Sequence, residues 1–99
     1  MLDIKKTVEN GTACFAISGR LDTSTAPQLE QEVKAVIGEL KELTLDFTGL
    51  EYVSSAGLRV LLSAQKIMNK QGEMKVTNVS SDVYEILEIT GFTDILTIE

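Results

Sequence analysis

The sequence predicts an α/β domain, in which helices pack on one mixed, mostly parallel β-sheet. Short apolar stretches typical of strands alternate along the chain with longer stretches of helical period. The first two strands are joined by a hairpin dipeptide, whereas most later strands follow a helix, as in right-handed parallel crossover units. At 99 residues the chain is long enough for one domain with its own core, which we assign to residues 1–99.

A β-hairpin is predicted at the start of the chain. Residues 2–8 alternate apolar with polar side chains, which indicates a strand with one buried face; the apolar ones are Leu2, Ile4 and Val8. Asn10-Gly11 then favours a type I′ turn, because both residues tolerate positive φ. The returning strand, residues 13–18, is mostly apolar, so we expect it to be buried on both faces and to end at Gly19.

The first helix is predicted from a cap signal followed by an apolar stripe. Thr25 is placed to cap it, with Gln28 completing a capping box and Pro27 tolerated in the first turn. Apolar residues then recur with a period of 3.6, at Leu29, Val33, Val36, Ile37 and Leu40.

The second half of the chain repeats the strand-then-helix pattern. Residues 43–47 alternate as a third strand, and Gly49 is expected to open a loop. The second helix is predicted from about Ser55 to Gln71, with Gly72 ending it in the left-handed conformation. Its apolar face comprises Leu58, Leu61, Leu62 and Met68.

The last elements are a strand, a helix and a short strand. Residues 73–79 predict the fourth strand, and residues 81–90 predict a helix that stops at Gly91. The helix would bury Val83, Ile86 and Leu87. Residues 94–98 are predicted to add a final short strand.

Composition excludes several classes of function. The chain has no histidine, which removes the Ser-His-Asp triad and the commonest zinc ligand. No Gly-rich phosphate loop precedes the second helix. The net charge of −6 and the scattered basic residues argue against nucleic-acid binding. We therefore expect neither an enzyme nor a metal or other cofactor.

The expected location is the cytoplasm, without membrane insertion. The first residues contain no apolar segment of the kind a signal peptide needs, and no apolar run approaches the length of a membrane span. The single Cys14 has no disulfide partner, and we expect it to be a small buried side chain in a reducing compartment.

Ser54 and Ser55 stand directly before the second helix and allow two interpretations. In the first, one of them caps the helix by accepting a hydrogen bond from a free backbone N–H group. In the second, an exposed hydroxyl is a phosphorylation site, because the free N–H groups and the helix dipole favour a phosphate there. Both roles are compatible with the same serine.

Three motifs resemble the STAS domain of bacterial anti-sigma factor antagonists, and the resemblance covers essentially the whole chain. Gly19-Arg20-Leu21-Asp22 is similar to the G-x-[LI]-D sequence with which a strand of the family ends. Gly91-Phe92 is similar to the Gly-Phe or Gly-Leu step that follows the family's last helix. The stretch from Ser54 to Arg59 is similar to the motif D-S-[SAT]-G-[LI]-[GR]. This match puts the family's phosphorylated serine on Ser55. Ser54 then stands where the motif has aspartate, and it is a possible second acceptor.

The resemblance implies a partner-switching protein. Unphosphorylated, it would bind an anti-sigma factor that is also a serine kinase and so release a sigma factor. Phosphorylation of Ser55 would end the binding, and a metal-dependent serine phosphatase would restore it. The partner-binding residues implied are Asp22, Thr23, Ser24, Ser54, Ala56, Gly57 and Arg59. The stretch from Tyr52 to Ser54, which leads to Ser55, is also part of the implied contact surface. The alternative is a constitutive STAS subunit that regulates a transporter or acts as a scaffold in a signalling complex, with Ser55 only a helix cap.

Overall fold

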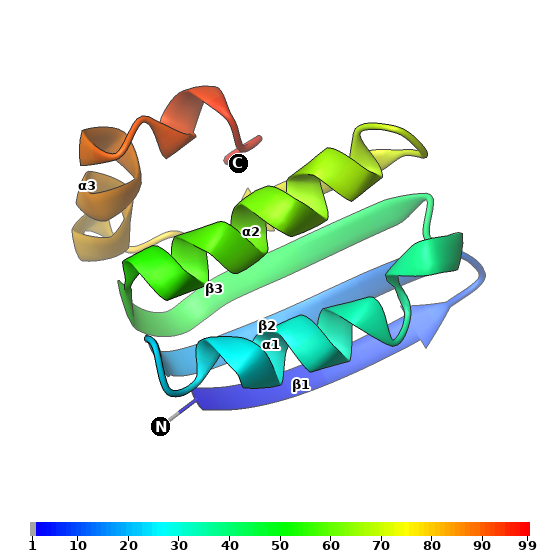
Figure 1. Cartoon of the computed structure of the whole chain (residues 1–99), viewed down its shortest axis with the longest axis horizontal. Helices are drawn as coiled ribbons and strands as arrows, with labels where there is room; N and C mark the ends of the chain where they lie inside the picture. Colours follow the sequence, from blue (N-terminus) through cyan, green and yellow to red (C-terminus); the bar gives the residue numbers. More distant parts are fainter. Residues whose placement is uncertain (1) are drawn as a thin grey trace.

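A four-stranded sheet forms the centre of the computed structural model, which describes residues 2–99 (Figure 1). The strand order is β1-β2-β3-β4; β1 pairs antiparallel with β2, and the other two pairings are parallel. The strands are β1 (Leu2–Glu9), β2 (Thr12–Leu21), β3 (Glu42–Val53) and β4 (Glu73–Thr77). The helices are α1 (Ala26–Lys34), α2 (Ser55–Met68) and α3 (Ser81–Ile89), and two short 3₁₀ turns are η1 (Ile37–Glu39) and η2 (Phe92–Asp94). The predicted α/β fold class is confirmed.

One face of the sheet carries the helices and the core. Helices α1 and α2 lie side by side across this face, whereas α3 lies at one end of the sheet (Figure 1). The core between them is formed by alternate strand residues and by the apolar stripes of the helices. Its largest fully buried side chains include Phe15, Ile17, Leu29, Leu45, Phe47, Leu61 and Met68.

The predicted hairpin is confirmed, but two expectations about burial are wrong. Asn10 and Gly11 have φ of 49° and 80°, as a type I′ turn requires. Strand β2 is buried on its helix-facing side only, so Cys14 on the other side is half-exposed. Val8 is 45% exposed, because it lies near the hairpin end of the edge strand β1.

Helix α1 is shorter than predicted and begins differently. The Thr25 side chain makes no capping bond with the helix, and Gln28 donates to Leu2 O instead, so the capping box is wrong. The helix ends at Lys34 rather than at Leu40. The chain then passes through η1 to Lys41, whose N–H donates to the backbone oxygen of Gly11 in the hairpin (2.7 Å) just before β3 begins.

Strand β3 and the end of α2 differ from their predicted forms for steric reasons. Gly49 does not open a loop: β3 continues to Val53, and Gly49 allows a close approach to Ser18, whose Cβ would lie 2.6 Å from an added Cβ. Gly72 does not adopt positive φ. A Cβ on Gly72 would lie 1.9 Å from Lys41 O, so this position needs glycine because two backbone segments touch.

The C-terminal segment forms less regular structure than predicted. Strand β4 ends at Thr77, two residues earlier than expected, and Asn78 has a φ of 55°. Gly91 has a φ of 80° and follows α3, as predicted. The expected final strand is instead η2 followed by a single parallel bridge between Val76 and Ile98.

Candidate functional site

The candidate site lies where β2 and β3 end side by side. These strands are parallel neighbours, so their C-terminal ends meet at the same edge of the sheet. The Ser54 N–H donates to Leu21 O (2.8 Å), which ties the start of α2 to the loop between β2 and α1. The fold therefore brings together the two loops on which the sequence places the candidate residues.

The two serines have different environments. Ser54 is the N-cap of α2: its backbone is extended, its Oγ accepts from the Gly57 N–H (3.4 Å), and its carbonyl accepts from the Leu58 N–H (2.9 Å). Ser55 is the first helical residue and is exposed. Its hydroxyl makes no hydrogen bond with any other described residue. The cap is thus Ser54, and the alternative in which Ser55 is the cap is wrong.

Backbone donors are available beside the Ser55 hydroxyl. Within residues 2–99, the N–H groups of Ser55 and Ala56 have no acceptor, as expected in the first turn of a helix. They add to the positive end of the α2 dipole. A phosphate on Ser55 would therefore meet a favourable local field without any change in the fold.

Asp22 organises the neighbouring loop. Its Oδ1 accepts from the Ser24 hydroxyl (2.8 Å) and from the N–H groups of Ser24 (3.0 Å) and Thr25 (3.1 Å). The hydrogen bond from the Ser24 hydroxyl is the largest cause of a lowered pKa of Asp22, and the Thr25 and Ser24 donors add to it. Asp22 thus holds the backbone that leads into α1: its side chain binds the N–H groups of Ser24 and Thr25, and its carbonyl accepts from those of Thr25 and Ala26.

Thr25 has a different structural role. Its hydroxyl accepts from the Asp22 N–H (2.8 Å) and donates to Arg20 O (2.8 Å), and so holds the loop against the end of β2. Thr23 and Ser24 are exposed on the outside of this loop. The loop therefore presents polar side chains from a fixed backbone.

Two residues of the motif point into the protein. Leu58 is 7% exposed, which places it in the core. Gly57 is buried, and an added Cβ would lie 2.7 Å from Leu21 Cγ and 3.0 Å from Val53 Cγ1. Glycine here lets α2 pack closely on the strand ends, so we leave Gly57 out of the accessible contact surface.

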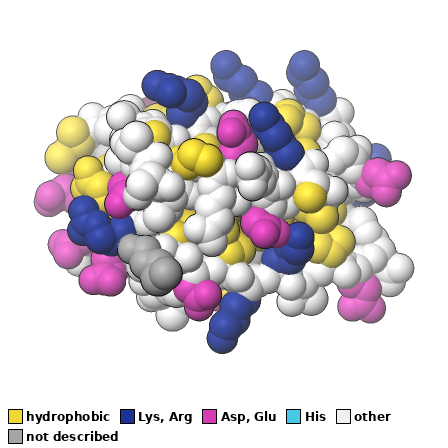
Figure 2. Space-filling model, turned by 60° about the horizontal axis from the view of Figure 1, so that its bottom comes forward, with side chains coloured by type: hydrophobic (Ala, Val, Ile, Leu, Met, Phe, Trp, Pro, Cys, Tyr) yellow, Lys and Arg dark blue, Asp and Glu magenta, His cyan; other side chains and the backbone are white. Residues whose placement is uncertain are grey.

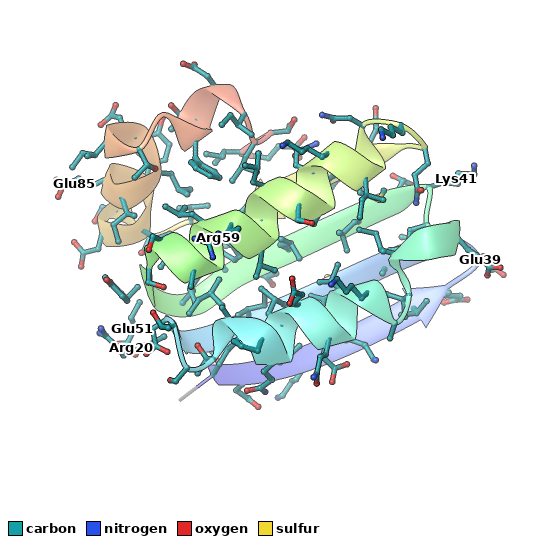
Figure 3. All side chains as sticks on the ribbon, viewed as in Figure 1. Arg20, Glu39, Lys41, Glu51, Arg59 and Glu85 are labelled. Atoms are coloured by element: carbon teal, nitrogen blue, oxygen red, sulfur yellow. The ribbon has the colours of Figure 1, made fainter. Side chains whose placement is uncertain are left out.

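Arginines flank the site on two sides. Arg59 is exposed on α2 four residues after Ser55, which places both side chains on one side of the helix. Arg20 lies at the end of β2, next to Glu51 in the view of Figure 3, with its guanidinium 4.4 Å from the centre of the Tyr52 ring. Glu39 and Lys41 lie at the opposite end of the molecule (Figure 3).

Neither a cluster of metal-ligating side chains nor a membrane-spanning helix occurs among the described residues. Residues 2–99 contain no cluster of three or more His, Cys, Asp or Glu side chains that could hold a metal ion. None of the helices in this range is long and apolar enough to cross a membrane. What the site does offer is an exposed hydroxyl, free N–H donors and a fixed polar loop.

The sequence is similar to a known family model and to named proteins. The model of the STAS domain matches residues 3–99. The chain belongs to the STAS domain family. One relative is BtrV from Bordetella bronchiseptica, whose suggested role is anti-sigma factor antagonism. BtrV and this chain are 38% identical over 89 residues, which are 87% of this chain and 76% of BtrV. An anti-sigma-B factor antagonist of Listeria monocytogenes is 31% identical over 84% of this chain and 75% of its own length.

Solved structures with the STAS fold match the chain closely. The anti-sigma factor antagonist SpoIIAA in its unphosphorylated form has a TM-score of 0.83 at 17% identity, covering 98% of this chain and 88% of SpoIIAA. The Bacillus cell fate determinant SpoIIAA in its phosphorylated form has a TM-score of 0.74 at 17% identity, covering 100% of this chain and 91% of its own. A sulfate transporter family protein from Wolinella succinogenes has a TM-score of 0.76 at 23% identity, covering 92% of this chain and 75% of its own. These likenesses establish the STAS fold.

The sequence placed the loop after β2 and the start of α2 correctly, but it missed the extension of β3 to Val53 and parts of the internal organisation of the site. The bond from Ser54 N–H to Leu21 O and the packing of Gly57 on Leu21 are long-range contacts. No local pattern predicts them. The loop role of Asp22 had a local signal, because Asp-x-Ser-Thr is a sequence in which a carboxylate can accept the next N–H groups.

Proposed function

We propose that this protein is an anti-sigma factor antagonist whose binding is switched by phosphorylation of Ser55. Unphosphorylated, it binds an anti-sigma factor that is also a serine kinase, and a sigma factor is released. The kinase transfers the terminal phosphate of its own Mg-ATP to Ser55 Oγ; the hydroxyl proton leaves to a base of the kinase, and ADP is formed. A metal-dependent serine phosphatase hydrolyses the phosphoserine and restores the binding form.

The observation that carries the proposal is the division of roles between the two serines. Ser54 supplies the cap that α2 needs, which leaves the exposed Ser55 hydroxyl free of hydrogen bonds with the other described residues. A kinase can therefore modify Ser55 without removing a bond that stabilises the helix. The class of partner comes from the names of relatives such as the Listeria antagonist.

The phosphate would act on the partner rather than on the fold. It adds about two negative charges at a position where the helix dipole favours them by roughly 0.3–1 kcal/mol. A partner that packs on this helix end would have to accommodate the phosphate in place of a small hydroxyl. A loss of about 3 kcal/mol of binding free energy lowers affinity roughly 150-fold, which is enough to reverse occupancy.

The contact surface we propose surrounds Ser55 on both loops. It combines the polar outside of the loop after β2 with the first exposed turn of α2. Its members are Asp22, Thr23, Ser24, Ser54, Ala56 and Arg59. Gly57 supports this surface from below through its contact with Leu21. We propose that the protein acts by binding alone and works in the cytoplasm, where sigma factors are used.

A pair of phosphate-mimicking substitutions tests the proposal. Ser55→Asp and Ser63→Asp add the same charge to exposed positions two turns apart on α2. The binding partner is the anti-sigma factor from the source organism, and calorimetry measures its affinity for each variant. We expect Ser55→Asp to lose roughly 100-fold in affinity and Ser63→Asp to lose less than about threefold. Equal affinity of Ser55→Asp and the wild type would contradict the switch and favour a constitutive scaffold.

A further inference from the structure

Charge is distributed very unevenly along this chain. Residues 76–99 contain five acidic residues and no lysine or arginine, whereas residues 1–75 contain ten acidic and nine basic residues. Nearly all of the net charge of −6 therefore lies in the last quarter of the chain. This quarter forms α3, η2 and the segment after them.

The acidic side chains of this region are exposed. Asp82, Glu85, Glu88 and Asp94 lie on α3 and η2, and all four face solvent. Glu99 is the one acidic residue of this region that forms an ion pair within residues 2–99, with Lys75 at 3.9 Å. The exposed side of α3 thus carries negative charge that no described basic side chain neutralises.

Exposed apolar side chains occur in the same segment. Four large hydrophobic residues of the described chain are prominently exposed, and three of them lie between positions 84 and 95. Ile89 is 77% exposed, and Tyr84 and Ile95 are each 41% exposed. Single exposed apolar residues are common on soluble proteins, but three within twelve residues are a local concentration.

Acidic and apolar residues are neighbours on α3. Tyr84 and Glu88 are four residues apart, as are Glu85 and Ile89, so each pair lies on adjacent turns of one side of the helix. The opposite side, with Val83 and Leu87, packs into the core. The surface seen in Figure 2, toward the edge of β1 and α1, is different: basic and acidic side chains are interspersed there.

We infer that the exposed side of α3 is a second interaction surface, for a basic segment of a protein partner. We call it the α3 surface and define it by Tyr84, Glu85, Glu88 and Ile89. Lysine or arginine side chains would pair with the carboxylates, and one or two apolar side chains would cover Ile89 and Tyr84. An arginine could also lie over the Tyr84 ring.

The α3 surface is separate from the proposed contacts of Ser55. Glu85 points outward from α3, away from Arg59 on α2 (Figure 3). Binding there does not require the Ser55 hydroxyl, so it persists when Ser55 carries a phosphate. The inference does not rest on the proposed switch, and the two can fail independently.

The test uses a synthetic amphipathic peptide of lysine and leucine with helical spacing as the probe. The ¹⁵N-labelled full chain is titrated with it at about 50 mM salt, where surface charges are weakly screened. We expect amide shift changes confined to residues 79–96 and saturable binding in the range of about 0.1 mM. A peptide with serine in place of leucine is expected to bind at least about threefold more weakly.

Matched variants assign the binding to charge and to apolar contact. Glu85→Gln with Glu88→Gln should weaken binding about tenfold, whereas Glu39→Gln with Glu42→Gln, the same change at the other end of the molecule, should weaken it less than twofold. Ile89→Ser should weaken it about fivefold and Val8→Ser less than twofold.

Three results would overturn the inference. One is the absence of saturable binding up to about 1 mM peptide. Another is shift changes spread over all exposed carboxylates, which would indicate general attraction to an acidic protein. The third is an equal loss in the variants at positions 39 and 42. All substituted side chains are exposed, so far-UV circular dichroism is expected to be unchanged and serves as the check on folding.

Discussion

The two serines before α2 are predicted to respond in opposite ways to removal of their hydroxyl groups. Ser54→Ala removes the acceptor for the Gly57 N–H, whereas Ser55→Ala removes a hydroxyl that bonds to no other described residue. Loss of an N-cap serine costs about 0.5–2 kcal/mol of unfolding free energy. Because the bond to Gly57 is long, at 3.4 Å, we expect the lower half of this range, about 0.5–1 kcal/mol.

Thermal and urea unfolding measure this difference. A change of 1 kcal/mol shifts Tm by about 4–8 °C in a domain of this size, so Ser54→Ala should lower Tm by roughly 2–8 °C. Ser55→Ala should change the unfolding free energy by less than about 0.5 kcal/mol. Ser54→Asp should keep the stability of the wild type, because aspartate caps as well as serine and its charge suits the helix N-terminus. A loss of stability in Ser55→Ala equal to that in Ser54→Ala would refute the assignment of the cap.

Three further predictions concern the fold around the site. Gly72→Ala forces a Cβ to within 1.9 Å of Lys41 O, and it should lower the free energy of unfolding in urea by about 3 kcal/mol or more. Gly38 has open space around it, so Gly38→Ala should be neutral or stabilising by up to about 1 kcal/mol. Equal effects of the two substitutions would refute the steric argument. Asp22→Asn should be less stable than the wild type at neutral pH. This difference should shrink as pH falls below 3.8, because the lowered pKa of Asp22 stabilises the folded state only while the carboxylate is ionised; a difference independent of pH would contradict this role. Leu61→Ala removes a fully buried side chain and should cost about 2–5 kcal/mol, and a cost below about 1 kcal/mol would mean that α2 packs differently.

Local patterns in the sequence predicted the elements well where one physical cause dominated. Positive φ at Asn10-Gly11 and at Gly91 follows from the tolerance of these residues for the left-handed region. The alternation of residues 43–47 and the stripe that begins at Leu29 follow from one-sided burial. These signals fixed the order of the elements and the sheet class.

The errors arose where contacts between distant segments decide the local structure. Gly72 was interpreted as a left-handed helix stop, but its reason is the approach of the Lys41 carbonyl, which lies 31 positions away in sequence. The stripe through Leu40 predicted a longer α1, yet the helix ends at Lys34, and the chain passes through η1 to Lys41, whose N–H donates to Gly11 O. A stripe shows which side chains are buried, and both a helix and a 3₁₀ turn can bury them.

For the candidate site, the sequence identified the residues but did not show which of Ser54 and Ser55 caps α2 and which presents an exposed hydroxyl. The motif placed both serines at a helix start, and only the backbone geometry assigns the cap to Ser54. The α3 surface had a signal that could have been read directly: no basic residue follows Lys75. Exposure of Ile89 had no such signal, because an apolar residue in a helix is usually expected to be buried.

Intact-mass spectrometry with fragment mapping tests the central claim most directly. The wild type, Ser55→Ala and Ser54→Ala are each incubated with Mg-ATP and the anti-sigma factor kinase of the source organism. We predict one added phosphate on Ser55 in the wild type and in Ser54→Ala, and none in Ser55→Ala. Phosphate on Ser54 alone, or no phosphate on the wild type while a control substrate is modified, would contradict the account.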